Sequence, residues 1–271
     1  MIAVAYCVVI VFLGMIGYLV KFMVQDSQEI INNPANKRQE LLAERIVRGD
    51  IVSSDGRVLA TTETDQKGNE TRVYPYKNVF CHVVGRVWNS KTGIELEQSF
   101  PLLTSHVNPL KQLSNQLQGQ KNQGDIVVTT LNAKLQQIAY DALGNQKGAV
   151  VAIEPSTGKI LAMVSKPDYD PNTVRSEWDS LVADEGGNSA LLNRATQGLY
   201  PPGSTFKILT AMEYMRENPS FDKYRYECSG SDTFGGNVIR CYNGEHHGTV
   251  DLKSSLAHSC NGSFAHIGVG L

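Results

Sequence analysis

The segment Pro201-Pro202-Gly203-Ser204 constrains the fold of this 271-residue chain more than any other stretch. Two consecutive prolines force an extended approach, and the glycine lets the backbone come close to a neighbouring group. A helical pattern of apolar residues follows at once and runs to the break at Pro219. The sequence therefore predicts an extended segment that turns directly into a helix. The apolar positions of this helix are Phe206, Ile208, Leu209, Ala211, Met212 and Met215.

Ser204 and Lys207 share one face of the predicted helix, at its N-terminal end. The free N–H groups and the partial positive charge of a helix N-terminus stabilise a developing serine alkoxide. A lysine with the ordinary pKa of about 10.4 is neutral in only roughly one molecule in 2,500 at pH 7. Burial lowers that pKa, and the positive helix end acts in the same direction. The spacing predicts Ser204 as a nucleophile and Lys207 as its proton acceptor.

The Ser-x-x-Lys pattern is weak by itself, because this chain contains it three times. Ser156 and Lys159 lie in a Ser-Thr-Gly turn between two apolar runs, which is typical of a hairpin. Ser220 and Lys223 follow an Asn-Pro pair that ends a helix. The alternative for Ser204 is an ordinary helix N-cap, so a second motif is needed to decide.

That second motif is Ser259-Cys260-Asn261, which supplies a hydroxyl and a carboxamide two residues apart. Ser259 is predicted to relay a proton towards a leaving amine, and Asn261 to hydrogen-bond the backbone of a substrate. The intervening cysteine is expected to point away from the substrate. Together the two motifs favour an active-serine acyl transferase over a simple N-cap.

Ser-x-x-Lys followed by Ser-x-Asn resembles the motif order of penicillin-binding proteins and class A β-lactamases. The chain resembles a class B penicillin-binding protein, a membrane-anchored transpeptidase that cross-links peptidoglycan. The resemblance covers nearly the whole chain from about residue 45 onwards. The segments that carry it are RGDIVSSDGRVLA (48–60), RVYPYKNVFCHVVGR (72–86), GAVVAIEPSTGKILAMVSKPDYDPN (148–172) and LLNRATQGLYPPGSTFKILTA (191–211).

The resemblance implies a D,D-transpeptidase that acts on the D-alanyl-D-alanine end of a stem peptide through an acyl-enzyme on Ser204. It implies β-lactams as covalent inhibitors, no metal or organic cofactor, and a glycosyltransferase of the division or elongation machinery as a partner. Two alternatives stay open. One is hydrolysis, as a D,D-carboxypeptidase, a β-lactamase or a penicillin sensor. The other is a non-catalytic protein that binds the division or elongation machinery.

The third motif of the family, Lys-Thr/Ser-Gly, follows Ser-x-Asn on a strand beside the active serine. Lys91-Thr92-Gly93 spells it, but precedes Ser204 by more than 100 residues and is interpreted as a chance match. We therefore expect the third motif beyond Leu271, and a fragment with little or no activity. The motif would bind the substrate carboxylate and complete the oxyanion hole; losing one oxyanion donor costs about 10²–10³ in rate.

Three regions are predicted: a transmembrane anchor over 1–24, a pedestal or interaction module over 25–124, and a transpeptidase domain over 125–271. Residues 1–20 carry no charge, and a helix of that length spans about 30 Å, the thickness of a bilayer core. An uncleaved single-pass anchor in the plasma membrane is expected. Basic residues lie only on its C-terminal side, which by charge counting would be inside; the resemblance requires the catalytic domain on the extracytoplasmic side.

The expected fold is α+β, an antiparallel sheet covered by helices. Residues 25–46 read as a polar helical stretch, residues 47–124 as a β-rich module, and residues 112–125 as a linker or exposed loop. A helix capped by Asn132 precedes two strands joined by the Ser-Thr-Gly turn. Its predicted buried stripe is Leu135, Ile138, Ala139, Ala142 and Leu143. A net charge of −2 and a pI of about 6.3 give no electrostatic reason to expect nucleic-acid binding.

The cysteines leave three alternatives open. Cys228 and Cys241 bracket a predicted hairpin and can pair as a disulfide outside the membrane. His246 and His247 follow, so a zinc site is conceivable, but the short paired spacing of structural zinc sites is missing. Reduced thiols are the third alternative.

Overall fold

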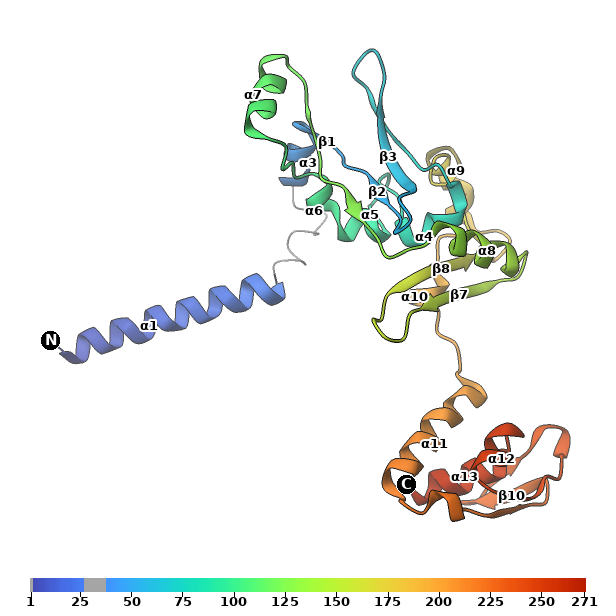
Figure 1. The fold of residues 1–271 in the computed structure, drawn as a ribbon. Coiled ribbons are helices and arrows are strands. Elements are labelled where there is room, and N and C mark those ends of the chain that lie inside the picture. Colours follow the sequence, from blue (N-terminus) through green and yellow to red (C-terminus); the bar gives the residue numbers. More distant parts are fainter. Residues whose placement is uncertain (1, 27–37) are drawn as a thin grey trace. The chain divides into compact units, whose positions relative to one another are not determined.

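The computed structural model describes residues 2–26 and 38–271. The chain divides into two compact units, Met1–Gly198 and Leu199–Leu271, and each is described by itself. Strands and helices occur in both, which confirms the expected α+β class (Figure 1). The predicted region boundaries at residues 24 and 124 remain predictions.

The first described element is the apolar helix α1 (Ile2–Lys21), followed by the π-helical turn η1 (Phe22–Asp26). Tyr6–Gln25 has a mean hydropathy of 2.4, and this 20-residue stretch is long and apolar enough to cross a membrane. The predicted polar helix over 25–46 falls largely on residues outside the described ones. Its described part contains α3 (Arg38–Ala43).

Two small sheets organise the region after α3. The larger has the strand order β4-β3-β2-β6, with β2 antiparallel to β3, β3 antiparallel to β4, and β2 parallel to β6. In the smaller, β1 pairs with β5 in parallel. The strands are β1 (Ile46–Val47), β2 (Ile51–Val52), β3 (Val58–Thr64), β4 (Glu70–Val73), β5 (Asn122–Gln123) and β6 (Val127–Val128). The core beneath them contains Ile51, Leu59, Ala60, Tyr74, Phe80, Val84, Leu102, Leu131 and Ala133.

Short helices fill the chain between β4 and β5. They are η2 (Lys77–Phe80), α4 (Cys81–Val84), α5 (Gly93–Glu97), α6 (Ser99–Leu102) and α7 (Pro109–Leu117). The prediction of a loop or linker over 112–125 is wrong, because α7 occupies its first half and β5 pairs within its second. The Asn108 side chain caps α7 by accepting a hydrogen bond from Leu110 N, and Pro109 fits the first helical turn. Those N-terminal signals outweigh the polar composition.

A buried ion-pair network joins β4 to α5 and to the Arg48-Gly49 pair. The Glu95 carboxylate has no solvent exposure and accepts from Arg48 Nε at 2.6 Å and from Arg72 Nε at 2.7 Å. Next to Arg48, a side chain on Gly49 would place its Cβ 2.0 Å from the carbonyl oxygen of Asp125. Arg48 is therefore needed for an electrostatic reason, and Gly49 is needed for a steric one.

The hairpin predicted over 148–166 is confirmed, with β7 (Gly148–Ile153) antiparallel to β8 (Ile160–Lys166). Asn132 caps α8 (Ala133–Leu143) through a hydrogen bond from Leu135 N. The predicted stripe on α8 is partly wrong: Ile138 and Ala142 are exposed. Gln136 is buried instead, because its amide pairs with backbone groups of Val79 and Met163. The unit ends with α9 (Val174–Ala183) and α10 (Arg194–Gln197).

The second unit packs its three helices together, beside two antiparallel strand pairs, β9–β12 and β10–β11 (Figure 1). Its core contains Ala211, Tyr224, Leu252, Phe264 and Ile267. The other apolar positions of α11 are exposed by 44–61%. The elements are η3 (Gly203–Thr205), α11 (Phe206–Glu217), η4 (Phe221–Lys223), β9 (Tyr226–Cys228), β10 (Ser231–Phe234), β11 (Asn237–Arg240), η5 (Tyr242–Gly244), β12 (Gly248–Val250), α12 (Leu252–Ala257) and α13 (Asn261–Gly270).

Candidate active site

Ser204 lies in the tight turn that leads into α11. Gly203 has a φ of 55°, a left-handed conformation that favours glycine. The turn is held by Thr205, whose N–H and hydroxyl donate to Pro202 O at 3.3 and 2.6 Å. Within the described residues, the caps of η3 and α11 receive no side-chain hydrogen bond. Ser204 is therefore not a helix cap, and its hydroxyl remains exposed at the mouth of the helix.

Ser259 lies in the sharp turn between α12 and α13. Its φ of 51° is uncommon for a residue with a side chain, and such backbone strain persists only where surrounding contacts enforce it. Two of those contacts are visible. Ser259 N donates to Leu256 O at 3.1 Å, and Ser259 O accepts from Lys207 Nζ at 2.6 Å. The strained turn thus holds Ser259 against the start of α11.

All four residues predicted for the site meet in the second unit. Ser259 Oγ donates to Ser204 Oγ at 2.9 Å. Lys207 Nζ donates to Ser259 Oγ at 2.9 Å and to Asn261 Oδ1 at 2.5 Å. Asn261 Nδ2 in turn donates to Arg240 O at 2.7 Å. The two motifs, which are far apart in the sequence, form one hydrogen-bonded chain.

Lys207 connects to Ser204 through Ser259 in this arrangement. Within the described residues, Lys207 makes no direct hydrogen bond to Ser204, and its three acceptors match the three hydrogens of an ammonium group. Burial lowers the pKa of Lys207 below its usual range, and the thiols of Cys241 and Cys260 offset part of that effect. A lowered pKa makes the neutral amine more accessible, which a proton acceptor needs.

The other Ser-x-x-Lys pairs do not form sites of this kind. Ser156 lies in the turn between β7 and β8, and Ser220 immediately precedes the short turn η4. Lys91-Thr92-Gly93 belongs to the first unit. There the Thr92 hydroxyl accepts from Arg86 N at 3.2 Å.

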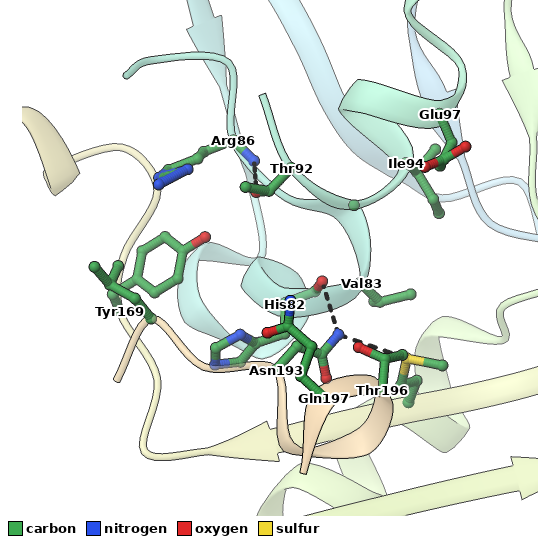
Figure 2. Close-up of a pocket in the computed structure, with 13 residues that line it drawn as sticks. His82, Val83, Arg86, Thr92, Ile94, Glu97, Tyr169, Asn193, Thr196 and Gln197 are labelled. Carbon is green, nitrogen blue, oxygen red and sulfur yellow. Dashed lines mark hydrogen bonds between the residues drawn. The ribbon is translucent and has the colours of Figure 1, made fainter. Parts of the chain in front are cut away.

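A cavity of about 420 Å³ lies beside Thr92 in the first unit (Figure 2). Its walls include the buried side chains of His82, Arg86 and Tyr169. Asn193 Nδ2 reaches across it to His82 O at 3.3 Å (Figure 2). Every lining residue belongs to the first unit, whereas the serine and lysine of the candidate site belong to the second.

Sequence reasoning missed the backbone of Arg240 and the grouping of three cysteines. Cys228, Cys241 and Cys260 are free and buried, and they form one cluster behind the Ser-x-Asn turn. The hairpin β10–β11 brings the first two together, as the sequence predicts. Cys260 lies beside them because the turn between α12 and α13 packs against the other two cysteines, and no local sequence pattern predicts this contact.

Comparison with known proteins agrees with this geometry. Residues 148–268 match the family model described as the penicillin-binding protein transpeptidase domain. The chain is 34% identical over 257 residues to the peptidoglycan D,D-transpeptidase PbpA of Mycobacterium tuberculosis H37Rv. This alignment covers 88% of this chain and 52% of the relative. It is 30% identical over 240 residues to MrdA of Escherichia coli K12, which covers 73% of this chain and 37% of the relative.

Among solved structures, the imipenem acyl-enzyme complex of penicillin-binding protein A from M. tuberculosis superposes with a TM-score of 0.74 at 32% identity. The match covers 84% of this chain and 56% of that one. The family match and the structural match thus define a penicillin-binding protein transpeptidase domain over residues 148–268. The chain is homologous to the class B penicillin-binding proteins PbpA and MrdA. It spans about half the length of the PbpA proteins it matches.

Proposed function

We propose that this chain forms the acylating centre of a peptidoglycan D,D-transpeptidase. The observation that carries the proposal is the hydrogen-bonded sequence Ser204 Oγ, Ser259 Oγ, Lys207 Nζ. A serine alone is a weak nucleophile and needs a base within reach. Here the base reaches the nucleophile through one intervening hydroxyl, and burial lowers the pKa of that base. The family membership supplies the substrate class, the D-alanyl-D-alanine end of a stem peptide.

The chemistry follows from the positions of these groups. Ser204 Oγ attacks the carbonyl carbon between the two D-alanines, and its proton passes through Ser259 to Lys207. The tetrahedral intermediate then collapses, the C–N bond breaks, and the leaving D-alanine takes up a proton returned through Ser259. An amine of a second stem peptide then attacks the ester carbonyl carbon, and the bond from that carbon to Ser204 Oγ breaks. The proton that the amine loses passes through Lys207 and Ser259 to Ser204 Oγ, which completes the cross-link and frees the serine. β-Lactams mimic the donor and stop at the ester.

Asn261 has two roles in this proposal. Its Oδ1 holds Lys207 and one Nδ2 hydrogen holds Arg240 O. The second Nδ2 hydrogen is available to the backbone of a substrate. We propose further that α1 anchors the chain as a single membrane pass, with this site on the extracytoplasmic side where its substrate lies. A glycosyltransferase of the division or elongation machinery is the partner that supplies the glycan strands.

Intact mass of the detergent-solubilised full chain after incubation with benzylpenicillin tests the proposal. The wild type is expected to gain one penicillin, and Ser204→Ala none. Ser220→Ala is the matched control, because it removes the serine of another Ser-x-x-Lys pair and should leave the adduct intact. An adduct that persists in Ser204→Ala would refute the assignment of Ser204 as the nucleophile. A folded wild type that stays unmodified would refute the proposal that this chain by itself acylates.

The pH dependence tests the role of Lys207. The neutral amine is the reactive form, so acylation should accelerate as pH rises. Burial lowers the pKa of Lys207, and the rise should therefore occur below the pH expected for an ordinary lysine. Lys207→Met should reduce the acylation rate by about 10²–10⁴ and remove this limb of the profile. A profile that Lys207→Met leaves unchanged in shape would contradict the role of the lysine as base.

A further inference from the structure

Four soft or borderline ligand atoms converge behind the Ser-x-Asn turn. Cys228 ends β9, Cys241 follows β11, His247 precedes β12, and Cys260 caps α13. The three cysteine residues are 0–4% exposed. The Sγ atoms of the cysteines and one ring nitrogen of His247 all lie within 4.8 Å of one another.

The separations match a tetrahedral metal centre. Zinc–sulfur bonds of about 2.3 Å and zinc–nitrogen bonds of about 2.0 Å place tetrahedral sulfurs about 3.8 Å apart, and sulfur about 3.5 Å from nitrogen. Here Cys228 Sγ lies 3.6 Å from Cys241 Sγ, and Cys241 Sγ lies 3.8 Å from Cys260 Sγ. Cys228 Sγ lies 3.4 Å from His247 Nδ1. Three edges of the expected tetrahedron are therefore already formed.

Two polar groups contact the ligand residues from outside the cluster. Ser263 N donates to Cys260 Sγ at 3.4 Å, at the N-terminus of α13. His247 Nε2 lies 3.6 Å from a carboxylate oxygen of Glu245. A carboxylate behind a histidine is the usual arrangement that orients a metal-binding imidazole.

We propose that Cys228, Cys241, His247 and Cys260 bind a single Zn²⁺ ion that fixes the Ser-x-Asn turn. Three thiolates and one imidazole in tetrahedral array form a closed structural zinc site, and soft sulfur ligands select against magnesium and calcium. The expectation of no metal is revised by this inference. Of the two adjacent histidines, His247 is the one that faces the sulfur atoms.

The proposed metal ligands are next to residues of the candidate active site in the sequence. Cys260 stands between Ser259 and Asn261, and Cys241 directly follows Arg240, whose carbonyl holds Asn261. A metal that ties Cys260 to Cys241 therefore holds both sides of the Asn261 hydrogen bond in place. The statement that zinc positions Asn261 rests on the proposed function, because it concerns the geometry of the acylating centre. The binding of zinc by the four residues does not rest on the proposed function.

Metal content of the full chain is the first measurement. The chain is purified in detergent from zinc-supplemented cells, without chelators, and analysed by inductively coupled plasma mass spectrometry. About one zinc per chain is expected for the wild type, and near zero for Cys241→Ser and for His247→Ala. Cys7→Ser and Cys81→Ala are matched controls outside the cluster and should retain the ion. Replacement of Zn²⁺ by Co²⁺ should give the thiolate-to-metal charge-transfer band of a tetrahedral site.

Three outcomes would overturn the zinc site. One is a folded wild type that contains no zinc. Another is an intact mass that shows a disulfide among the cluster cysteines of freshly purified protein. The third is zinc retained by both ligand variants. A variant that fails to fold does not decide the matter, because the wild-type stoichiometry and the cobalt spectrum stand without it.

The positioning role has a separate readout. Removal of zinc from the wild type should slow benzylpenicillin acylation of Ser204, and re-addition should restore it. An acylation rate that is independent of zinc refutes the positioning role while the metal site stands. A chain that binds zinc but is never acylated refutes the proposed function instead.

Discussion

Loss of Glu95 should destabilise the first unit strongly. It is completely buried and balances two arginines, Arg48 and Arg72, whose side chains are 10% and 6% exposed. Glu95→Ala leaves two buried guanidinium groups facing each other without a counter-charge. Removal of one partner of a buried ion pair costs about 3–5 kcal/mol. For a unit of this size, that corresponds to a fall in Tm of roughly 6–20 °C.

Intrinsic fluorescence follows this unit selectively. The chain contains two tryptophans, Trp88 and Trp178, and both lie in the first unit with ring centroids 5.5 Å apart. Thermal unfolding of the detergent-solubilised chain, followed by tryptophan emission, therefore reports on the unfolding of the unit that contains Glu95. Glu97→Ala is the matched control, on the same helix but exposed, and should change stability by no more than about 0.5 kcal/mol. Equal shifts in Tm for the two variants would show that the network does not stabilise the unit.

Two further predictions concern the same unit and the same fluorescence signal. Gly49→Ala should destabilise the first unit by at least about 1–3 kcal/mol, because the new Cβ would lie 2.0 Å from Asp125 O. Gly148→Ala, where the nearest atom is 3.9 Å away, should have little effect on stability. A larger loss of stability for Gly148→Ala than for Gly49→Ala would contradict the steric argument. Burial lowers the pKa of His82 below 6.5, so below pH 6.5 the unfolded chain binds a proton that the folded one does not, and stability falls with falling pH. His82→Gln should lose less stability than the wild type between pH 7 and about 5, and parallel pH curves would rule out this histidine.

The candidate site was predictable because its two motifs are local. Pro201-Pro202-Gly203 sets the entry into α11, and the spacing of Ser204 and Lys207 follows from the helix period. No local pattern predicts that Ser259 stands between them. That depends on the left-handed backbone of Ser259, which packing of α12 and α13 enforces rather than any preference of serine.

Two predictions were wrong, one because a local helix start outweighs polar composition and one because tertiary contacts override the apolar period. The polar, Gln/Asn-rich composition of residues 112–125 predicts a linker, yet α7 forms because Asn108 and Pro109 provide a helix start. On α8 the apolar period placed Ile138 in the core, while Gln136 is buried because backbone groups of other elements satisfy its amide.

The sequence by itself determined the apolar N-terminal helix, the α+β class, the β7–β8 hairpin and the spacing of Ser204 and Lys207 in the candidate site, since each is encoded by residues within a few positions of one another. Only the tertiary structure decided which groups touch Lys207, and that three cysteines and His247 converge. Their spacing resembles no zinc motif, because the ligands come from β9, β11, the approach to β12 and α13. Contacts between elements distant in sequence carry no periodicity, and they become visible only when the chain is folded.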